Sequence, residues 1–154
     1  MRVTVRVRGV TELDRKLKTL GDSLYKFQPA MKQIGTRVGS FYANEVFASQ
    51  GGALGKRWQA LAVSTVKDKI RDGYRSEVNR PLERTGIMRR SFKATTTQNS
   101  VTIENTIPYF KYHQSSEPRS KIPYRPMMAI NDNVMSIVKE VIEADVRQKL
   151  DALA

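Results

Sequence analysis

The sequence has no cysteine and a single histidine among its 154 residues. Without cysteine there is no disulfide framework, no thiolate zinc site and no cysteine nucleophile, so we expect a chain that folds in a reducing cytoplasm on its hydrophobic core. No apolar run approaches the roughly 18 residues of a membrane-spanning helix, and the charged N-terminus lacks the apolar core of a signal peptide. These absences predict a soluble protein with no membrane contact.

Acidic residues are scarce in the first 93 positions. Residues 1–50 carry nine bases and four acids, residues 51–93 carry eleven and four, and residues 94–154 carry seven of each. The net charge of +12 therefore lies in the N-terminal 93 residues. A basic excess of this kind indicates a polyanionic partner, either nucleic acid or an acidic protein surface.

Four short segments have the composition of β-strands. In the first, three valines alternate with charged or polar residues, which is the pattern of a strand with one wet face. The second and third flank the turn sequence Gln98-Asn99-Ser100 and predict a hairpin. The four segments are about 3–7, 91–97, 101–106 and 126–130.

Apolar residues at helical spacing predict three long helices, over about 11–24, 29–47 and 132–153. Pro29 suits a first helical turn, and Asn131 is the expected N-cap of the last helix. Shorter helices are expected at about 63–71, 82–90 and 108–113.

The chain length suits one domain, spanning residues 1–154. We expect an α+β fold with a sheet of about four mostly antiparallel strands, long helices packed on one face of that sheet, and extended loops. The segment 49–80 is polar, basic and glycine-bearing. Since it offers few apolar residues to offset the entropy of ordering, it is predicted to be a long mobile loop around its short helix.

Catalytic chemistry has little support in this sequence. His113 stands alone, so it cannot form a metal site, and as a general base it would need a carboxylate such as Glu104 or Glu117. A structural, hydrogen-bonded imidazole is favoured. The glycine-rich stretch 51–57 lacks the spacing and the hydroxyl residue of a phosphate-binding loop. We expect no enzyme, no cofactor and no metal.

Residues of the basic half are candidate contacts with a partner. Trp58 lies in the polar segment, where it either anchors a partner or pins the loop back onto its own domain, and both alternatives stay open. Interleaved bases and aromatics suit either phosphates or an acidic protein neighbour, and the protein neighbour is favoured. The basic set is Lys56, Arg57, Lys67, Lys69, Arg71, Arg75, Arg80, Arg84, Arg89 and Arg90. The interface candidates are Trp58, Lys56, Arg57, Leu61, Thr65, Arg71, Tyr74, Arg75, Arg2, Arg6 and Arg8.

Four short motifs follow one another along the middle of the chain. The first consists of Trp58, Leu61, Thr65 and Lys69; the second of Leu82, Thr85, Gly86, Met88, Arg89 and Ser91; the third of Pro108, Tyr109, His113 and Gln114; the fourth of Ile122, Pro123, Arg125 and Pro126. In residue type, order and spacing they resemble the virion morphogenesis or tail-completion family of Mu-like and related tailed bacteriophages.

The resemblance implies a structural virion protein that acts at the head-proximal end of the tail, the neck, and completes the tail for joining to the DNA-filled head. The implied partners are tail terminator, tail tube and head connector proteins, together with further copies of the chain in a ring, hexameric by tail symmetry, with non-specific contact to DNA in its lumen. Implied structural motif residues are Thr85, Gly86, Ser91, Tyr109, His113, Arg125 and Pro126. The alternative is a basic nucleic-acid-binding accessory protein without sequence specificity.

Overall fold

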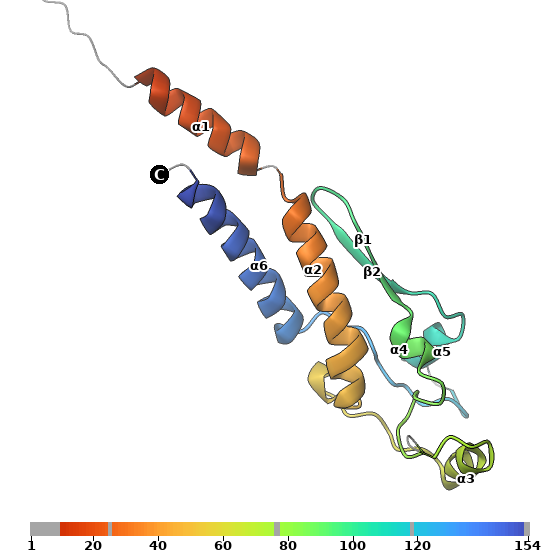
Figure 1. Ribbon diagram of the computed structural model, residues 1–154. Coiled ribbons are helices and arrows are strands. Elements are labelled where there is room, and N and C mark those ends of the chain that lie inside the picture. Colours follow the sequence, from red (N-terminus) through yellow and green to blue (C-terminus); the bar gives the residue numbers. More distant parts are fainter. Residues whose placement is uncertain (1–9, 25, 76–77, 118, 153–154) are drawn as a thin grey trace, which may run out of the picture.

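The computed structural model describes residues 10–24, 26–75, 78–117 and 119–152. Its centre is helix α2 (Gln28–Ser40), which lies between a β-hairpin on one side and helix α6 (Asp132–Asp151) on the other (Figure 1). The hairpin consists of strands β1 (Phe92–Thr96) and β2 (Val101–Asn105). These elements form three layers, and α2 in the middle contributes to both interfaces.

Helix α2 continues without a break as a π-helical segment, η1 (Phe41–Val46), and so confirms the predicted helix over 29–47. Its apolar residues recur at helical spacing, so one face of the long helix enters the core. The buried residues on this face are Ala30, Ile34, Gly35, Val38, Phe41, Tyr42 and Val46.

The hairpin approaches α2 most closely at Gly35. A Cβ atom at this glycine would lie 3.0 Å from the Cβ of Ala94, so the absent side chain gives β1 room against the helix. The two strands pair antiparallel, and the register runs from Phe92 opposite Asn105 to Thr96 opposite Val101. The predicted hairpin is confirmed.

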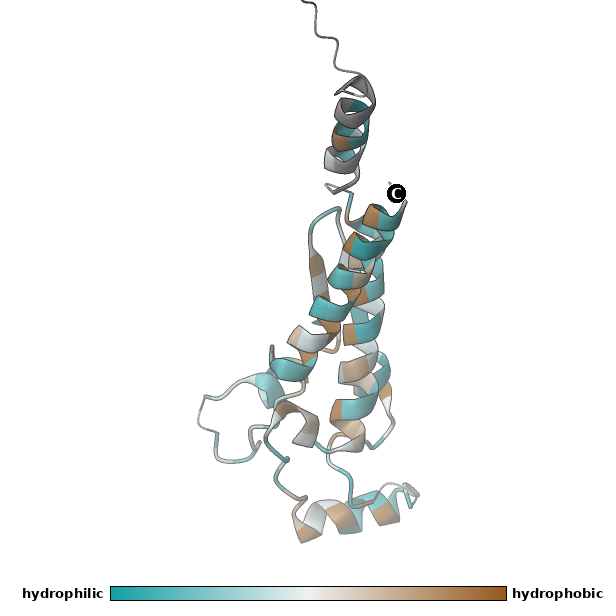
Figure 2. Cartoon of the chain, turned by 90° about the vertical axis from the view of Figure 1, so that its left-hand side faces the viewer, coloured by the Kyte–Doolittle hydropathy of each residue, from teal (hydrophilic) through white to brown (hydrophobic). Residues whose placement is uncertain are grey.

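Helix α1 (Val10–Leu24) extends away from the three layers (Figures 1 and 2) and confirms the helix predicted over 11–24. It contacts α6 near the turn into α2. There, the Lys149 ammonium donates to the carbonyl of Lys26 at 3.0 Å and lies 4.3 Å from the ring centre of Phe27. A single lysine of α6 thus holds the connection between α1 and α2.

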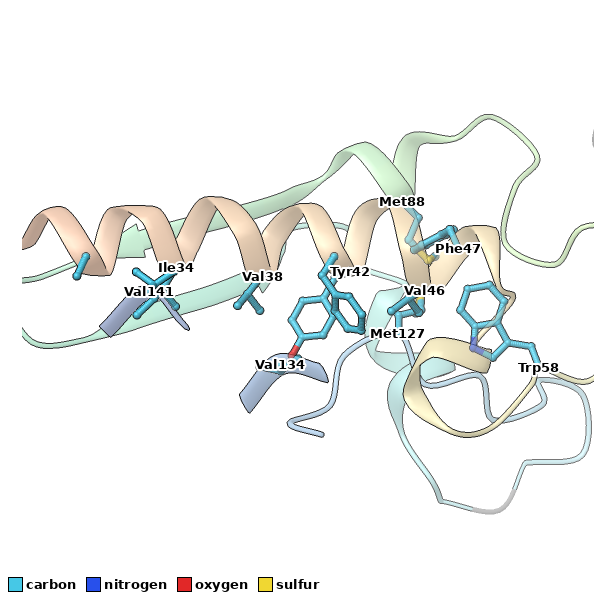
Figure 3. Packing of buried hydrophobic residues seen from close by; sticks show 12 residues of the cluster. Ile34, Val38, Tyr42, Val46, Phe47, Trp58, Met88, Met127, Val134 and Val141 are labelled. Carbon is cyan, nitrogen blue, oxygen red and sulfur yellow. The ribbon is translucent and has the colours of Figure 1, made fainter. Parts of the chain in front are cut away.

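An aromatic cluster closes the core just beyond η1, and Figure 3 shows two of its members, Phe47 and Trp58. The Phe47 ring meets the Trp58 ring edge-on, with ring centres 5.2 Å apart, and meets Phe92 at 6.3 Å. Phe110 stands edge-on to Phe92 at 6.0 Å. Edge-to-face contacts of this kind stabilise a core beyond the apolar area they bury. Because the four rings come from four separate segments, the cluster ties together parts of the chain that are distant in sequence.

The expected mixture of helices and antiparallel strands is confirmed, but the prediction of about four strands is wrong. Over the ranges that the structure describes, the sheet has two strands. The strand predicted over 3–7 lies outside those ranges. The helices also do not share one face of the sheet, since α2 covers the hairpin and α6 packs on α2.

The segment 126–130 is extended, yet it does not pair as a strand. Side chains take the place of a neighbouring strand. The amide oxygen of Gln114 accepts the N–H groups of Met127 and Met128 at 2.9 and 3.1 Å, and its nitrogen donates to the Met128 carbonyl at 2.7 Å. A tyrosine hydroxyl of η1 donates to the carbonyl of Ala129 at 2.8 Å. Composition predicted an extended backbone here. Which groups hydrogen-bond to that backbone depends on the tertiary structure.

The helix predicted over 82–90 is shorter than expected. Leu82 and Gly86 have φ angles of 62° and 68°, in the left-handed region, so the residues before α4 form turns. The predicted helices over 63–71 and 108–113 are confirmed. The shorter helices are η2 (Gly52–Leu54), α3 (Val63–Arg71), α4 (Ile87–Arg90) and α5 (Phe110–Gln114).

Two glycines of the turn after η1 provide a matched pair of substitutions. Gly51 and Gly55 have φ angles of 86° and 85°, but a Cβ on Gly51 would lie 2.5 Å from the Trp58 ring and from the Lys56 carbonyl, whereas a Cβ on Gly55 meets nothing within 4 Å. Gly55→Ala is expected to cost about 1 kcal/mol through backbone strain alone. Gly51→Ala adds overpacking and is expected to cost about 2 kcal/mol. Urea unfolding measures both, and equal losses would contradict the packing of Trp58 against this turn.

Candidate functional site

The four sequence motifs converge on two adjoining cavities, of about 290 and about 500 Å³. Leu61, Thr65, Leu82 and His113 line both of them, and so belong to three different motifs. Arg125, from the fourth motif, lines the larger cavity. We call the residues of the four motifs that surround these cavities the motif cluster.

Trp58, from the first motif, is a residue of the hydrophobic core, with 5% of its surface exposed. Its indole nitrogen donates to the carbonyl of Pro126 at 2.7 Å, and its backbone N–H donates to Gln50 at 2.7 Å. Of the two alternatives left open for this residue, the structure shows the second, in which the ring pins the loop onto its own domain. The first motif is thereby bonded to the fourth.

Arg125 is equally buried, with 5% exposed, and it joins three motifs. Its Nε and Nη2 atoms donate to the carbonyl of Gln59 at 3.1 and 3.0 Å, and its backbone N–H donates to the carbonyl of His113 at 2.9 Å. Burial lowers the pKa of the Arg125 guanidinium, but an arginine side chain stays charged in a protein. The charged guanidinium of Arg125 therefore bonds the backbone of the first motif to the fourth motif.

Lys69 and Arg80 were expected on a basic surface, and the structure corrects this. Lys69 is 3% exposed, and its ammonium donates to the carbonyl of Arg80 at 2.9 Å. Arg80 in turn donates to the carbonyl of Phe47 at 3.0 Å and pairs with the buried carboxylate of Glu83 at 3.4 Å. The buried charge of Lys69 needs such a partner, whereas Arg80 is half-buried and bonds inward. Trp58 and Arg80 bond the segment 49–80 to Pro126 and Phe47. The mobility of this segment stays a prediction.

The second motif shapes the start of α4. Gly86 supplies the left-handed turn before the helix, and the Ser91 hydroxyl donates to the carbonyl of Ile87 at 2.7 Å. The Thr85 hydroxyl accepts from the N–H of Ile87 at 3.4 Å. Sequence reasoning missed Asn105, whose amide donates to the carbonyl of Met88 at 2.7 Å and bonds β2 to this helix. Residue type alone offered no signal for that contact.

His113 lines both cavities and is half-buried. Burial lowers its pKa below the usual 6.5, and the positive charges of Arg125 and Arg119 lower it further. Its Nδ1 atom is buried and has no hydrogen-bond partner within the described part of the chain, so the expected hydrogen-bonded imidazole is not found at this atom. The side chain is therefore neutral near pH 7. Tyr109 also lines the smaller cavity.

The His113 pKa predicts a pH dependence of stability. Because the folded-state pKa lies below the unfolded value, the unfolded chain binds the proton more readily. The contribution of His113 is complete above about pH 6.5 and is lost as the pH falls from there toward the folded pKa. Chemical unfolding at pH 7.5 and 5.5 is expected to show a drop in stability that His113→Gln reduces. An equal drop in both proteins would exclude His113 as its origin.

The remaining interface candidates lie outside the core. Lys56, Arg57, Arg71 and Arg75 are exposed, whereas Leu61 and Tyr74 are half-buried. Thr65 is exposed at the mouths of the two cavities, and the Arg84 guanidinium lies 5.6 Å from the ring centre of Tyr74. Arg71 pairs with Asp68 at 3.0 Å and with Asp72 at 3.3 Å, so part of its charge is already compensated. Arg2, Arg6 and Arg8 fall outside the described ranges.

The described residues offer neither a metal-binding group nor a membrane-spanning helix. Within those ranges, no group of three or more histidine, cysteine or acidic side chains is placed to hold a metal ion. No helix in that part of the chain is both long and apolar enough to span a membrane.

Comparison with known proteins agrees with the motifs. The model of the phage virion morphogenesis family matches residues 9–147, a range that contains all four motifs, the hairpin and α2. Searches of curated proteins and of solved structures give no match. The match over most of the chain confirms the resemblance seen in the motifs. The chain therefore belongs to the phage virion morphogenesis family, and its role is in the structure or assembly of a bacteriophage particle.

Proposed function

We propose that this protein completes the head-proximal end of a phage tail, so that the tail can join the DNA-filled head. In this role several copies form a ring at the neck, six in number if the ring follows tail symmetry, and DNA passes through the lumen. The neighbours are the tail terminator, the tail tube and the head connector. The contribution is structural and not catalytic.

The observation that carries the proposal is how the polar side chains of the motifs are used. Trp58 and Arg125 donate to backbone carbonyls of distant segments, and Lys69 donates to the carbonyl of Arg80 within its own segment. Gln114 donates to a carbonyl of the segment after Arg125. Each of these bonds fixes the path of a loop, because a buried carbonyl needs a donor. Motifs of this kind hold the loops in one conformation. A virion part needs such a fixed surface to bind its neighbours.

The exposed surface of the same region supports contact with neighbours. Val63 and Ile70 of α3 are 71% and 45% exposed, and Lys67 is exposed on the same helix. Arg57 and Arg75 flank α3 and are exposed as well. Exposed apolar side chains together with exposed bases in one segment suit an acidic protein partner, since complementary charge favours correct pairing.

Electron microscopy of lysates tests the proposed role. A phage or prophage that lacks this gene is expected to yield full heads beside separate tails, and a plasmid copy of the gene is expected to restore joined particles. Arg57→Glu together with Lys67→Glu is expected to restore fewer joined particles than wild type. Arg147→Glu, an exposed base in the neutral C-terminal part, is the matched control. Normal infectious particles without the gene would refute the proposal.

A second candidate function is sequence-independent DNA binding, which the exposed bases of residues 51–93 favour. Binding to phosphates releases counterions, so the affinity for duplex DNA would fall about a thousandfold or more between 50 and 200 mM salt if the contacts numbered six or more. Fluorescence anisotropy with a labelled duplex measures this. Absence of binding at low salt would remove this candidate.

A further inference from the structure

Among the described residues, no strand pairs with β2 on the side away from β1. At one end of the hairpin the N–H of Thr97 donates to the carbonyl of Ser100, and at the other end the N–H of Thr106 donates to the carbonyl of Ser91. These two bonds determine which residues of β2 hydrogen-bond to β1. In an antiparallel pair the backbone groups alternate in direction, so those of Val101 and Ile103 turn away from β1. An edge of this kind is ready to bond another strand.

An apolar groove of about 380 Å³ lies directly beside this edge. It is bounded by three elements that pack around α2, and Ile130 at its rim is 80% exposed, although it is a large apolar side chain. Figure 3 shows Ile34, Val38 and Val134, which line the groove, gathered between α2 and α6. The apolar residues that line it are Met31, Ile34, Val38, Val101, Ile103, Met128, Ile130, Val134 and Val138.

The two sides of α2 differ in character. The cavity beside β1 is lined mainly by small and polar residues, with Arg89, Arg90 and one aromatic, Phe92, whereas the groove beside β2 is lined mainly by valine, isoleucine and methionine. A strand with valines on one face fits the β2 side and not the β1 side. The edge and the groove therefore require the same occupant, a strand with one apolar face.

The chain itself contains such a strand in its first residues. Val3, Val5 and Val7 alternate with Arg2, Thr4, Arg6 and Arg8. We propose that residues 2–8 of one copy add to the β2 edge of a neighbouring copy, with the valines in the groove and the arginines outward. On that outer face of β2 stand Thr102 and Glu104, so the one acidic side chain of the strand meets the incoming bases. This mode of recognition takes its affinity from backbone bonds and its specificity from side-chain pockets.

The geometry favours a neighbouring copy over the same chain. Helix α1 has 15 residues and so carries its first residue about 22 Å from the turn into α2. It extends away from the hairpin and from the groove (Figures 1 and 2). Only residues 8 and 9 lie between Val7 and the helix, and a stretch of this length spans about 10 Å at most. The groove of the same chain therefore lies beyond the reach of these valines, which leaves the groove of a neighbouring copy as their site.

This strand addition rests on the proposed ring, for which it supplies the contact between copies. It joins copies head to tail, because the donated strand and the accepting edge are different surfaces. A contact of this type closes into a ring when its rotation allows.

Disulfide mapping between two differently substituted full-length chains tests the strand addition, and the natural chain has no cysteine to interfere. One chain carries Val3→Cys, Val5→Cys or Val7→Cys, and the other carries Ile103→Cys. After mixing and oxidation, at least one pair is expected to form a mixed disulfide, because facing residues of paired strands bring their Cβ atoms within reach. The same mixtures are oxidised for purified protein and for assembling particles in lysates.

Two controls make the result specific. Ala94→Cys replaces the acceptor with the residue opposite Ile103 on β1, and is expected to give no mixed disulfide. Thr4→Cys places the donor on the other face and is expected to react far less than the valine positions. Deletion of residues 2–8 is expected to abolish self-association in light scattering. The absence of a mixed disulfide, both in purified protein and in particles, would overturn strand exchange. A disulfide that forms only within a single chain carrying both substitutions would overturn it as well.

These outcomes separate the inference from the proposed function. If lysates without the gene show heads apart from tails while no mixed disulfide forms, tail completion stands and strand addition fails. If mixed disulfides form while particles lacking the gene are normal, the copies exchange strands but the neck role fails.

Discussion

Trp58→Ala is expected to lower the free energy of unfolding by about 3 to 5 kcal/mol, the range for removing a large aromatic from a core. The ring contacts Phe47 edge-on, and a Cβ on Gly51 would lie 2.5 Å from it, so its loss leaves a cavity that its rigid surroundings cannot close. It also removes the donor to the Pro126 carbonyl, which is then buried without a partner. Urea unfolding followed by circular dichroism measures the loss.

Two further variants divide this effect into its parts. Trp58→Phe keeps most of the ring but removes the indole donor, and about 1 to 3 kcal/mol of the loss should remain. Val63→Ala, at a residue that is 71% exposed, should change stability by less than about 0.5 kcal/mol. If Trp58→Ala were as mild as Val63→Ala, the ring would not be a core residue in solution. A failure of Trp58→Ala to assemble particles would therefore report unfolding before it reported a lost interface.

Arg125→Met is expected to cost about 3 kcal/mol, because bonds from a charged donor to a buried carbonyl contribute about 1.5 to 3 kcal/mol each. Methionine keeps an apolar stem of similar length but gives the Gln59 carbonyl no donor. The same change is expected to raise the His113 pKa, since the Arg125 charge is one of the causes that lower it. Chemical unfolding and an NMR titration of the single imidazole give the two results independently.

Arg119→Met is the matched control for this prediction. Arg119 also lowers the His113 pKa, but it is exposed and its guanidinium stacks 4.9 Å from the Tyr112 ring centre at the surface. Its removal should raise the His113 pKa with little change in stability. If both variants were equally stable, the bonds of Arg125 to the first motif would contribute nothing to the fold.

Local pattern predicted most of the secondary structure. Helix α3 coincides with the predicted 63–71, and the hairpin and the two long helices of the core lie close to their predicted positions. The Asn131 cap is also confirmed, because its side chain accepts the N–H of Val134 at 3.1 Å. These features depend on residues within a few positions of one another, and such contacts can be inferred from spacing.

The same kind of reasoning placed several side chains wrongly. Lys69 and Arg80 were assigned to a basic surface, because a run of bases in a polar segment usually faces water. The structure instead gives each of them a backbone carbonyl to bond, that of Arg80 for Lys69 and that of Phe47 for Arg80. Glu83 is buried and pairs with Arg80, although its polar sequence context predicts an exposed carboxylate. No local feature distinguishes a base on the surface from one that bonds a segment thirty residues away.

The sequence by itself determined the family, the predominance of helix, the hairpin and the concentration of positive charge in the first 93 residues, because each of these depends on residue type and short-range order. Only the tertiary structure decided that the four motifs enclose two cavities, that Trp58 and Arg125 are interior residues, and that 126–130 is held by side chains and not by a strand. The physical reason is that buried backbone groups must be satisfied by whatever donor the fold brings near. The tertiary arrangement decides which donor that is, and the sequence around the acceptor does not indicate it.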